Sequence, residues 1–102
     1  MPVGVDRHPD GSIWFTNGAN HSLLRIPPEG GEAEVILAGA GTGERQLFRP
    51  RAVKIDEKGA VWVLDHGNHR GVVISPSGQL RHFGSKPYLP AAAAGSGKGR
   101  VQ

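Results

Sequence analysis

Short apolar runs separated by turn residues dominate the sequence and predict β-strands. The clearest run, residues 60–64, reads AVWVL; a polar segment (DHGNH) and a second β-rich run at residues 70–75 follow it. Residues 12–16 (SIWFT) and 22–26 (SLLRI) repeat the same order. Branched and aromatic residues bounded by Gly, Asn, Asp and Pro are typical of strands. The apolar centres do not alternate with polar residues, so we expect the two central strands to be buried on both faces.

These segments are two copies of one pattern. A spacing of 48 residues separates Trp14 from Trp62, and the same spacing relates Asn20 to Asn68 and His21 to His69. A repeat of roughly 40–50 residues with four short strands is typical of a β-propeller blade. The predicted strands are residues 1–6, 12–16, 22–26, 33–38, 52–56, 60–64, 70–75 and 79–83. The predicted fold class is therefore all-β, with two four-stranded antiparallel propeller blades.

The predicted organisation is blade 1 at residues 1–46, blade 2 at residues 47–86 and a flexible low-complexity tail at residues 87–102. In this alignment the first strands of the two blades are 50 residues apart, which matches Asp6 with Asp56. The turn at residues 7–10 is then expected to be two residues longer than its counterpart in blade 2.

Composition limits the class of protein. The chain has 102 residues and no cysteine, which excludes a disulfide framework and a cysteine-based zinc site. No apolar run approaches the ~20 residues of a membrane span, so no membrane partner is expected. No basic segment followed by an apolar stretch opens the sequence, and a cytoplasmic location is the default expectation. Residues 1–44 carry a net charge of −4 and residues 45–102 carry +7.

Residues 48–84 resemble an NHL repeat. The matching residues are Pro50, Val53, Asp56, Gly59, Trp62, Val63, Asp65, Asn68, His69, Arg70 and Gly78. Residues 9–31 look more like the blades of virginiamycin B lyase-type propellers, which favour PDG-x-IWFT followed by an N-x-I-x-R-I strand. The resemblance implies a propeller fold over residues 3–84. It implies no single activity, because such propellers host lyases, lactonases, peptide-processing enzymes, RNA binders and protein-binding scaffolds.

Two blades do not close a ring, which typically needs ~4–8. We therefore expect an incomplete ring that closes by oligomerisation or belongs to a longer propeller. A sequence that starts inside a strand favours a truncated or engineered piece. The opposite charges of the two halves favour head-to-tail contacts between copies, and the predicted partners are further copies in a homo-oligomer or further blades of a longer chain.

Polar residues that differ between the repeats are the candidates for function, because residues present in both are expected to be architectural. The hairpin after the second strand and the crossing into the next blade should open on one face. We expect five side chains to share that rim: Asp65, His66, His69, Arg49 and Arg51. His66 beside a carboxylate could act as a catalytic general base, and the other four could bind a ligand. The alternative is a solvated loop with a surface Asp65–Arg70 pair worth at most about 1 kcal/mol.

No metal site and no cofactor are predicted. Asp65, His66 and His69 are three potential ligands on one hairpin without a fourth. The glycines of residues 39–43 lack the following helix that a dinucleotide site needs, so this segment is a linker. If the chain is lyase-like, the resemblance implies a divalent metal and a rim histidine.

Three functions stay open from the sequence. The first is an NHL-type propeller module that binds a protein or small-molecule ligand through its rim. The second is a fragment of a virginiamycin B lyase-like enzyme, which would open a cyclic ester by elimination. The third is RNA binding through the basic second blade, with phosphate contacts from Arg45, Arg49, Arg51 and Lys54 but few aromatic residues beside them.

Overall fold

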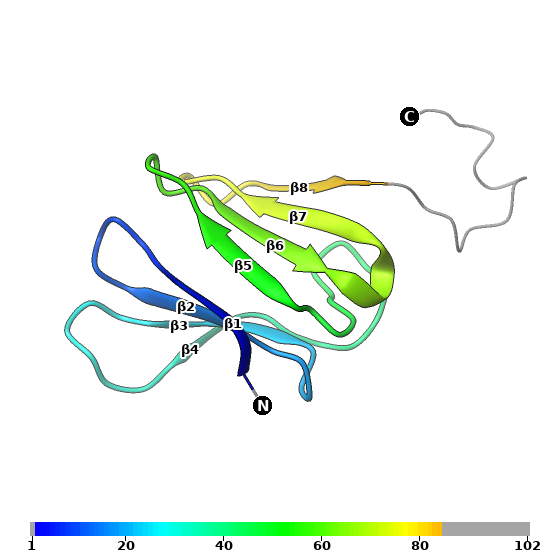
Figure 1. Cartoon of the computed structure of the whole chain (residues 1–102), viewed down its shortest axis with the longest axis horizontal. Helices are drawn as coiled ribbons and strands as arrows, with labels where there is room; N and C mark the ends of the chain where they lie inside the picture. Colours follow the sequence, from blue (N-terminus) through cyan, green and yellow to red (C-terminus); the bar gives the residue numbers. More distant parts are fainter. Residues whose placement is uncertain (1, 85–102) are drawn as a thin grey trace, which may run out of the picture.

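The chain folds into two four-stranded antiparallel sheets (Figure 1). The computed structural model describes residues 2–84, and the predicted tail lies outside them. Blade 1 consists of β1 (Pro2–Arg7), β2 (Ile13–Asn17), β3 (Ser22–Ile26) and β4 (Glu34–Leu37). Blade 2 consists of β5 (Ala52–Ile55), β6 (Val61–Asp65), β7 (Arg70–Ile74) and β8 (Leu80–Phe83). The predicted fold class is confirmed.

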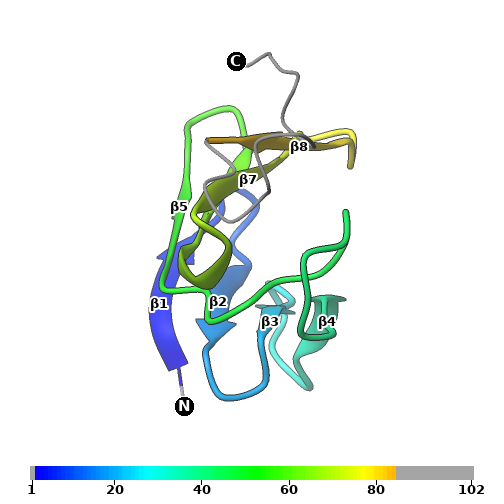
Figure 2. The same ribbon diagram turned by 90° about the vertical axis from the view of Figure 1, so that its right-hand side faces the viewer.

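The sheets pack as a wedge. Figure 2 shows β1 and β5 side by side at one edge, while β4 and β8 lie apart at the other. Gly4 makes the close approach possible, because a Cβ on it would lie 2.8 Å from the Cα of Ala52. One core cluster spans both sheets, with Trp14 and Leu23 from blade 1 and Val61 and Val63 from blade 2.

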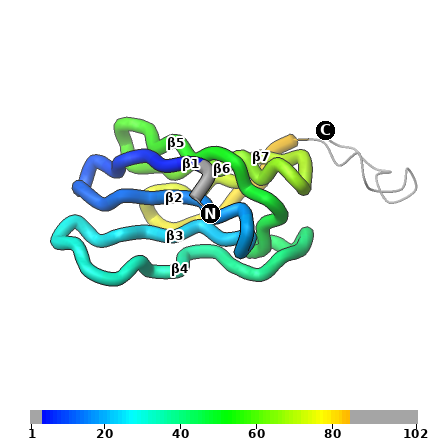
Figure 3. The backbone as a smooth tube through the Cα atoms, turned by 60° about the horizontal axis from the view of Figure 1, so that its bottom comes forward, coloured from blue at the N-terminus to red at the C-terminus, as the bar shows by residue number. Residues whose placement is uncertain are grey.

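Each sheet is a simple meander, as Figure 3 shows for β1–β4, and the first three strands of the two sheets pair in equivalent registers. Arg7 pairs with Ile13 in blade 1 as Ile55 pairs with Val61 in blade 2. The following turns carry equivalent backbone hydrogen bonds, from His8 N–H to the Ser12 carbonyl and from Asp56 N–H to the Ala60 carbonyl. The spacing is therefore 48 residues in the first strands too. The predicted spacing of 50 was wrong.

The equivalent residues of the first strands change with this correction. Asp6 corresponds to Lys54, and His8 corresponds to Asp56. The turn at residues 7–12 is as long as its counterpart. The alignment of Asp6 with Asp56 was wrong because an aspartate lies near the end of each first strand, but the two aspartates do not occupy equivalent positions in the strand pairing.

The prediction that both central strands are buried on both faces was also wrong. Burial alternates along β6, where Trp62 is 47% exposed and Leu64 is 49% exposed. The equivalent Trp14 is only 8% exposed, because the sheet of blade 2 covers it. No third sheet is present within residues 2–84 to cover the other side of blade 2.

The only helical element in residues 2–84 is η1 (His66–Asn68), a single turn between β6 and β7. None of the helical structure in this part of the chain has the length and apolar character that crossing a membrane requires.

Candidate functional site at the hairpin rim

The β6–β7 hairpin lies directly against the crossing segment that joins the blades. The N–H of Gly67 donates to the carbonyl of Phe48 at 2.7 Å, and the N–H of Arg51 donates to the carbonyl of Leu64 at 2.9 Å. The structure therefore brings the predicted hairpin residues and the predicted crossing residues to the same end of the sheets. We call this surface the hairpin rim; it comprises His21, Phe48, Arg49, Arg51, His66 and His69.

Asp65 lies beneath the rim, with a fully buried side chain. Its Oδ1 accepts the N–H of Phe48 at 2.7 Å. Its Oδ2 accepts from Asn68 Nδ2 at 2.8 Å and from Arg70 Nε at 2.9 Å. A buried carboxylate is costly without hydrogen-bond partners, and here the partners come from the chain itself. Asp65 therefore fixes the loop backbone.

Arg70 extends the same network into the crossing segment. Its guanidinium donates to the carbonyls of Thr42, Gly43 and Gln46 at 3.3, 2.9 and 2.6 Å. The Asp65–Arg70 ion pair thus forms as the alternative interpretation expected, but it is not at the surface: the side chains are 0% and 10% exposed. Asn68, which also donates to the carbonyl of Gly41 at 2.8 Å, has the architectural role expected of a repeated residue.

An aromatic stack joins the two blades at the rim. The ring of His21 lies parallel to that of Phe48, with centroids 5.0 Å apart. His21 Nδ1 accepts the N–H of Arg49 at 3.0 Å, and the Arg49 guanidinium lies 5.6 Å from the Phe48 ring centroid. These contacts hold Arg49 beside the β2–β3 hairpin. The sequence reasoning missed Phe48 as a rim residue; its position in the glycine-rich crossing was the only available signal.

The rim is held in an unusual backbone conformation. All three non-glycine residues with positive φ within residues 2–84 lie here: His21 at 53°, Arg49 at 54° and His69 at 54°. Side chains other than glycine adopt this left-handed region at some cost, and such residues persist only where surrounding contacts determine them. His21 and His69 are repeat equivalents, as the sequence indicated.

His66 and His69 are exposed on η1 and at its C-terminal end. Their ring centroids are 6.5 Å apart, with the rings tilted by 49°. The carboxylate of Asp65 does not pair with His66, because its oxygens accept from Phe48, Asn68 and Arg70. No group of three His, Cys, Asp or Glu side chains that could hold a metal ion is found in the part of the chain that the structure describes.

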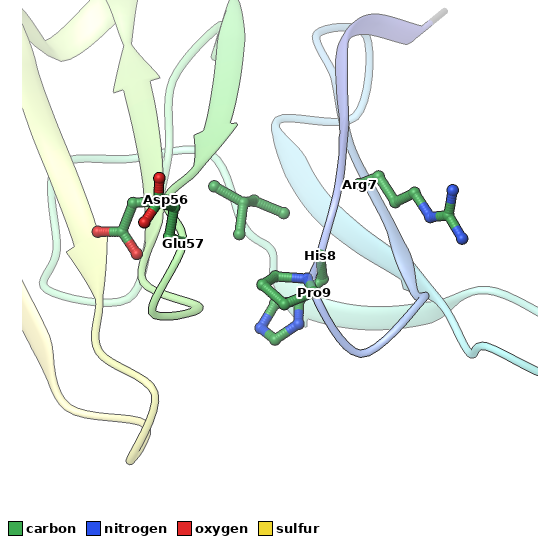
Figure 4. Close-up of a pocket in the computed structure, with 6 residues that line it drawn as sticks. Arg7, His8, Pro9, Asp56 and Glu57 are labelled. Carbon is green, nitrogen blue, oxygen red and sulfur yellow. The ribbon is translucent and has the colours of Figure 1, made fainter.

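A groove of about 400 Å³ lies at the opposite end of the blade pair (Figure 4). It is lined by Arg7, His8, Pro9, Ile55, Asp56 and Glu57. His8 Nε2 donates to the carbonyl of Gly59 at 3.2 Å, and its ring stacks on Trp14 with centroids 6.0 Å apart. His8 therefore links the two blades. The correct repeat alignment, which sets His8 against Asp56, would have marked it as an unmatched residue.

Turn carboxylates beside this groove have lowered pKa values. Hydrogen bonds from the hydroxyl and the N–H of Ser12 lower the pKa of Asp10 to about 2. The N–H of Ala60 is the main cause of the lowered pKa of Asp56, followed by the indole N–H of Trp62. These acids are charged at neutral pH and stabilise their own turns.

Comparison with known proteins found curated relatives whose names refer to peptide substrates. Peptidyl-alpha-hydroxyglycine alpha-amidating lyase 1 of Drosophila melanogaster is 30% identical over 89 residues, which cover 81% of this chain and 16% of the lyase. Peptidylglycine alpha-amidating monooxygenase of Rattus norvegicus is 31% identical over 86 residues, covering 78% and 9% of the two chains. The chain thus spans less than a fifth of the length of these relatives. No family model matches it.

Solved structures also resemble the chain, and they match it over most of its length. Virginiamycin B lyase from Staphylococcus aureus superposes with a TM-score of 0.65 and 17% identity, covering 82% of this chain and 27% of the enzyme. A catalytically inactive form of that enzyme, solved with quinupristin, gives 0.66. A streptogramin B lyase gives 0.64 with 22% identity, over 91% of this chain and 28% of that one.

The chain has a β-propeller fold. The two described sheets are two blades of that fold, and the ring is not closed. The predicted resemblance to virginiamycin B lyase-like propellers is confirmed at the level of the fold, which is what identities of 17% and 22% show.

Proposed function

We propose that this chain is a propeller module that binds a ligand or partner protein through the hairpin rim. The supporting observation is a set of exposed cationic and imidazole side chains on a backbone held by the buried Asp65. Arg49, Arg51 and His66 stand on this fixed segment. A surface whose loops are already ordered loses little entropy on binding, which favours affinity.

A peptide or depsipeptide ligand is the class that best suits this rim. Guanidinium groups pair with carboxylates and polarised carbonyls, and Phe48 with His21 adds an apolar stacked surface. The relatives support the same class, since one is named for peptidyl-alpha-hydroxyglycine and a structural neighbour was solved with quinupristin.

Lyase activity is the second candidate, favoured by the names of the amidating lyase and of the virginiamycin and streptogramin B lyases. In this case His66 is the residue we propose as general base. Because Asp65 is engaged elsewhere, His66 would act without a carboxylate partner from its own hairpin. A divalent metal, if the activity uses one, would need ligands beyond those that residues 2–84 bring together.

Amide chemical-shift mapping of the full chain tests the binding proposal. We expect quinupristin, or a short peptide ending in α-hydroxyglycine, to shift the amide signals of Arg49, Arg51 and Gly67. Arg49→Ala should weaken binding about tenfold, as expected for loss of one charged hydrogen bond. Glu57→Ala, at the opposite groove, is the matched control and should leave affinity unchanged.

Shifts confined to residues around His8 and Gly59, or none at millimolar ligand, would contradict the rim as the binding surface. Binding of a short oligouridine that weakens with salt and with Arg49→Ala would instead support the RNA alternative. Turnover of quinupristin that is lost in His66→Ala but kept in His69→Ala would support the lyase candidate.

A further inference from the structure

The exposed face of blade 2 is the counterpart of a face that blade 1 buries. We call the face of blade 1 that packs on blade 2, and the equivalent face of blade 2, the front. The opposite face of each sheet is the rear, so the rear of blade 2 contacts the front of blade 1. On the front of blade 1, cross-strand pairing aligns Asp6, Trp14, Arg25 and Glu34. The equivalent front row of blade 2 is Lys54, Trp62, Val73 and Arg81, and it is open to solvent at Trp62.

The contact between the blades shows what such a front face requires. The rear of blade 2 that covers Trp14 is a sheet with Val61 and Val63 at its centre, each 2% exposed. The front of blade 2 offers Trp62, Leu64 and Phe83, which are 47%, 49% and 42% exposed. Its apolar character therefore fits the rear face of another sheet, as in the observed contact.

Three features along the inner edge make the observed contact specific. The absence of a side chain at Gly4 lets β1 approach the backbone of Ala52. Asp6 Oδ2 accepts the N–H of Ile55 at 2.7 Å. His8 Nε2 donates to the carbonyl of Gly59 at 3.2 Å.

None of these three features is repeated on blade 2. A spacing of 48 residues sets Ala52, Lys54 and Asp56 in the places of Gly4, Asp6 and His8. If the rear of blade 1 from a second copy docked in the same way, the methyl of Ala52 would meet backbone near Gly4. Lys54 of the first copy would face the N–H of Arg7 of the second, and both groups are donors. Asp56 of the first copy would face the carbonyl of Gly11 of the second, and both groups are acceptors. Neither contact can form a hydrogen bond.

Charge leads to the same conclusion. The front row of blade 2 carries two cations, Lys54 and Arg81, and Asp56 at the inner edge is the acid beside them, where it accepts from the indole N–H of Trp62. On the rear of blade 1, the row of Val5, Phe15, Leu24 and Val35 is uncharged, and the neighbouring row adds Arg7. A second copy would therefore bring a further cation to a face where Lys54 and Arg81 already outnumber Asp56, which is unfavourable.

We propose that the front of blade 2 docks the rear of a sheet that is not this chain's blade 1, with an apolar centre and a carboxylate facing Lys54 and Arg81. This goes beyond ligand binding at the hairpin rim, because it concerns the face of blade 2 that is turned away from blade 1, and a protein partner. It selects between the two expectations from the sequence: a different blade completes the propeller, and a second copy does not.

Sedimentation equilibrium of the full chain tests the exclusion of a second copy. The wild-type protein should keep the mass of one chain across a concentration series. Ala52→Gly combined with Lys54→Asp and Asp56→His gives blade 2 the inner edge of blade 1, and this variant should associate head to tail at least about tenfold more tightly. Its Trp62 emission should shift to shorter wavelength. Adding Val5→Lys, at a site 66% exposed, should abolish that association.

Arg7→Glu tests the acidic character of the partner and keeps the proposal testable if the triple variant does not fold. It supplies a carboxylate near Lys54 of a neighbouring copy, so association should exceed that of wild type, weaken with salt and disappear with Lys54→Ala. The proposal is overturned if wild-type copies associate as tightly as either variant, or if neither folded variant associates. Binding of oligouridine that quenches Trp62 would equally overturn it, since the face would then be a stacking surface for nucleic acid.

Discussion

Trp14 and Trp62 occupy equivalent positions in the central strands of the two blades, yet one is 8% exposed and the other 47%. Each pairs within its own sheet in the same register. The difference comes from the next sheet, which covers Trp14 and is lacking over Trp62 within residues 2–84. Burial of a strand residue in a propeller blade therefore depends on the neighbouring blade as well. The sequence of the strand shows only that the residue can be buried.

The first prediction concerns how much each of the two tryptophans contributes to stability. Trp14→Ala should lower the free energy of unfolding by about 3–5 kcal/mol, because it removes a large side chain from the shared core. Trp62→Ala should change it by less than about 1 kcal/mol, since the side chain already contacts water. Urea unfolding followed by circular dichroism gives both values. Equal losses would mean that the front of blade 2 is covered in solution.

The second prediction compares the two hairpins. Asp65→Ala should cost about 3 kcal/mol or more, because it leaves the cation of Arg70 and the N–H of Phe48 without their buried partner. Asn17→Ala, the equivalent change in blade 1, should cost less than about 1 kcal/mol, since Asn17 accepts from Ala19 and Asn20 in an exposed turn. The same unfolding measurement applies. A mild effect at Asp65 would contradict its assignment as the anchor of the crossing.

The third prediction concerns the inner edges. Gly4→Ala should lower stability by about 1–3 kcal/mol, because the new methyl would lie 2.8 Å from the Cα of Ala52 and the strands would have to separate. Ala52→Gly, the equivalent position, should stay within about 1 kcal/mol of wild type. Thermal melting of the pair is sufficient, with native circular dichroism spectra as the control for folding. A neutral Gly4→Ala would show that β1 and β5 lie further apart in solution.

The fourth and smallest effect is the pH dependence of the contact between blades. The N–H of Ile55, and secondarily that of Arg7, lowers the pKa of Asp6 below its ordinary value of 3.8. A lowered carboxyl pKa stabilises the fold fully above about pH 4, and this contribution is lost as the pH falls through the folded pKa. Asp6→Asn should cost about 1 kcal/mol at pH 7 and give a shallower loss of stability below pH 4.

Urea midpoints at pH 7, 4 and 3 check this prediction. Lys54→Asn, at the equivalent position in blade 2, is the control and should leave the acid dependence unchanged. An Asp6→Asn variant that keeps the full wild-type acid dependence would assign that dependence to other carboxylates, such as Asp10.

Much of the fold could be predicted from the sequence because it depends on local patterns. The apolar runs and the Gly, Asn and Pro turns define the eight strands, and the repeated Trp, Asn and His define two copies. The two-sided burial of the central strands could not be predicted, since exposure of Trp62 depends on a neighbouring sheet. The pairing register of β1 could not be read either, because Asp6 and Asp56 look equivalent in the sequence and are not.

The sequence predicted that the candidate residues of the hairpin and the crossing lie at one end of the sheets, but it did not predict their surroundings. The blade pattern was enough to bring the crossing and the η1 hairpin together, as the hydrogen bond between Gly67 and Phe48 shows. It could not separate Asp65, which is buried, from His66, which is exposed one residue later. That distinction depends on Asn68, Arg70 and the carbonyls of residues 41–46, contacts between segments that no local pattern specifies.

The hydrogen bonds from Arg70 to three carbonyls of the crossing segment have a mechanical consequence. Residues 41–51 are tied to blade 2 at Gly41, Gly43, Gln46, Phe48 and Arg51, and so they move as part of that blade. Gly39 and Ala40 are in turn paired with Leu47, by the hydrogen bond from the Leu47 N–H to the Gly39 carbonyl and by the bridge between Ala40 and Leu47, so Ala38 alone separates this unit from β4. A change in the angle of the wedge would therefore have to break the contacts of His21 with Phe48 and Arg49, which hold this unit to blade 1.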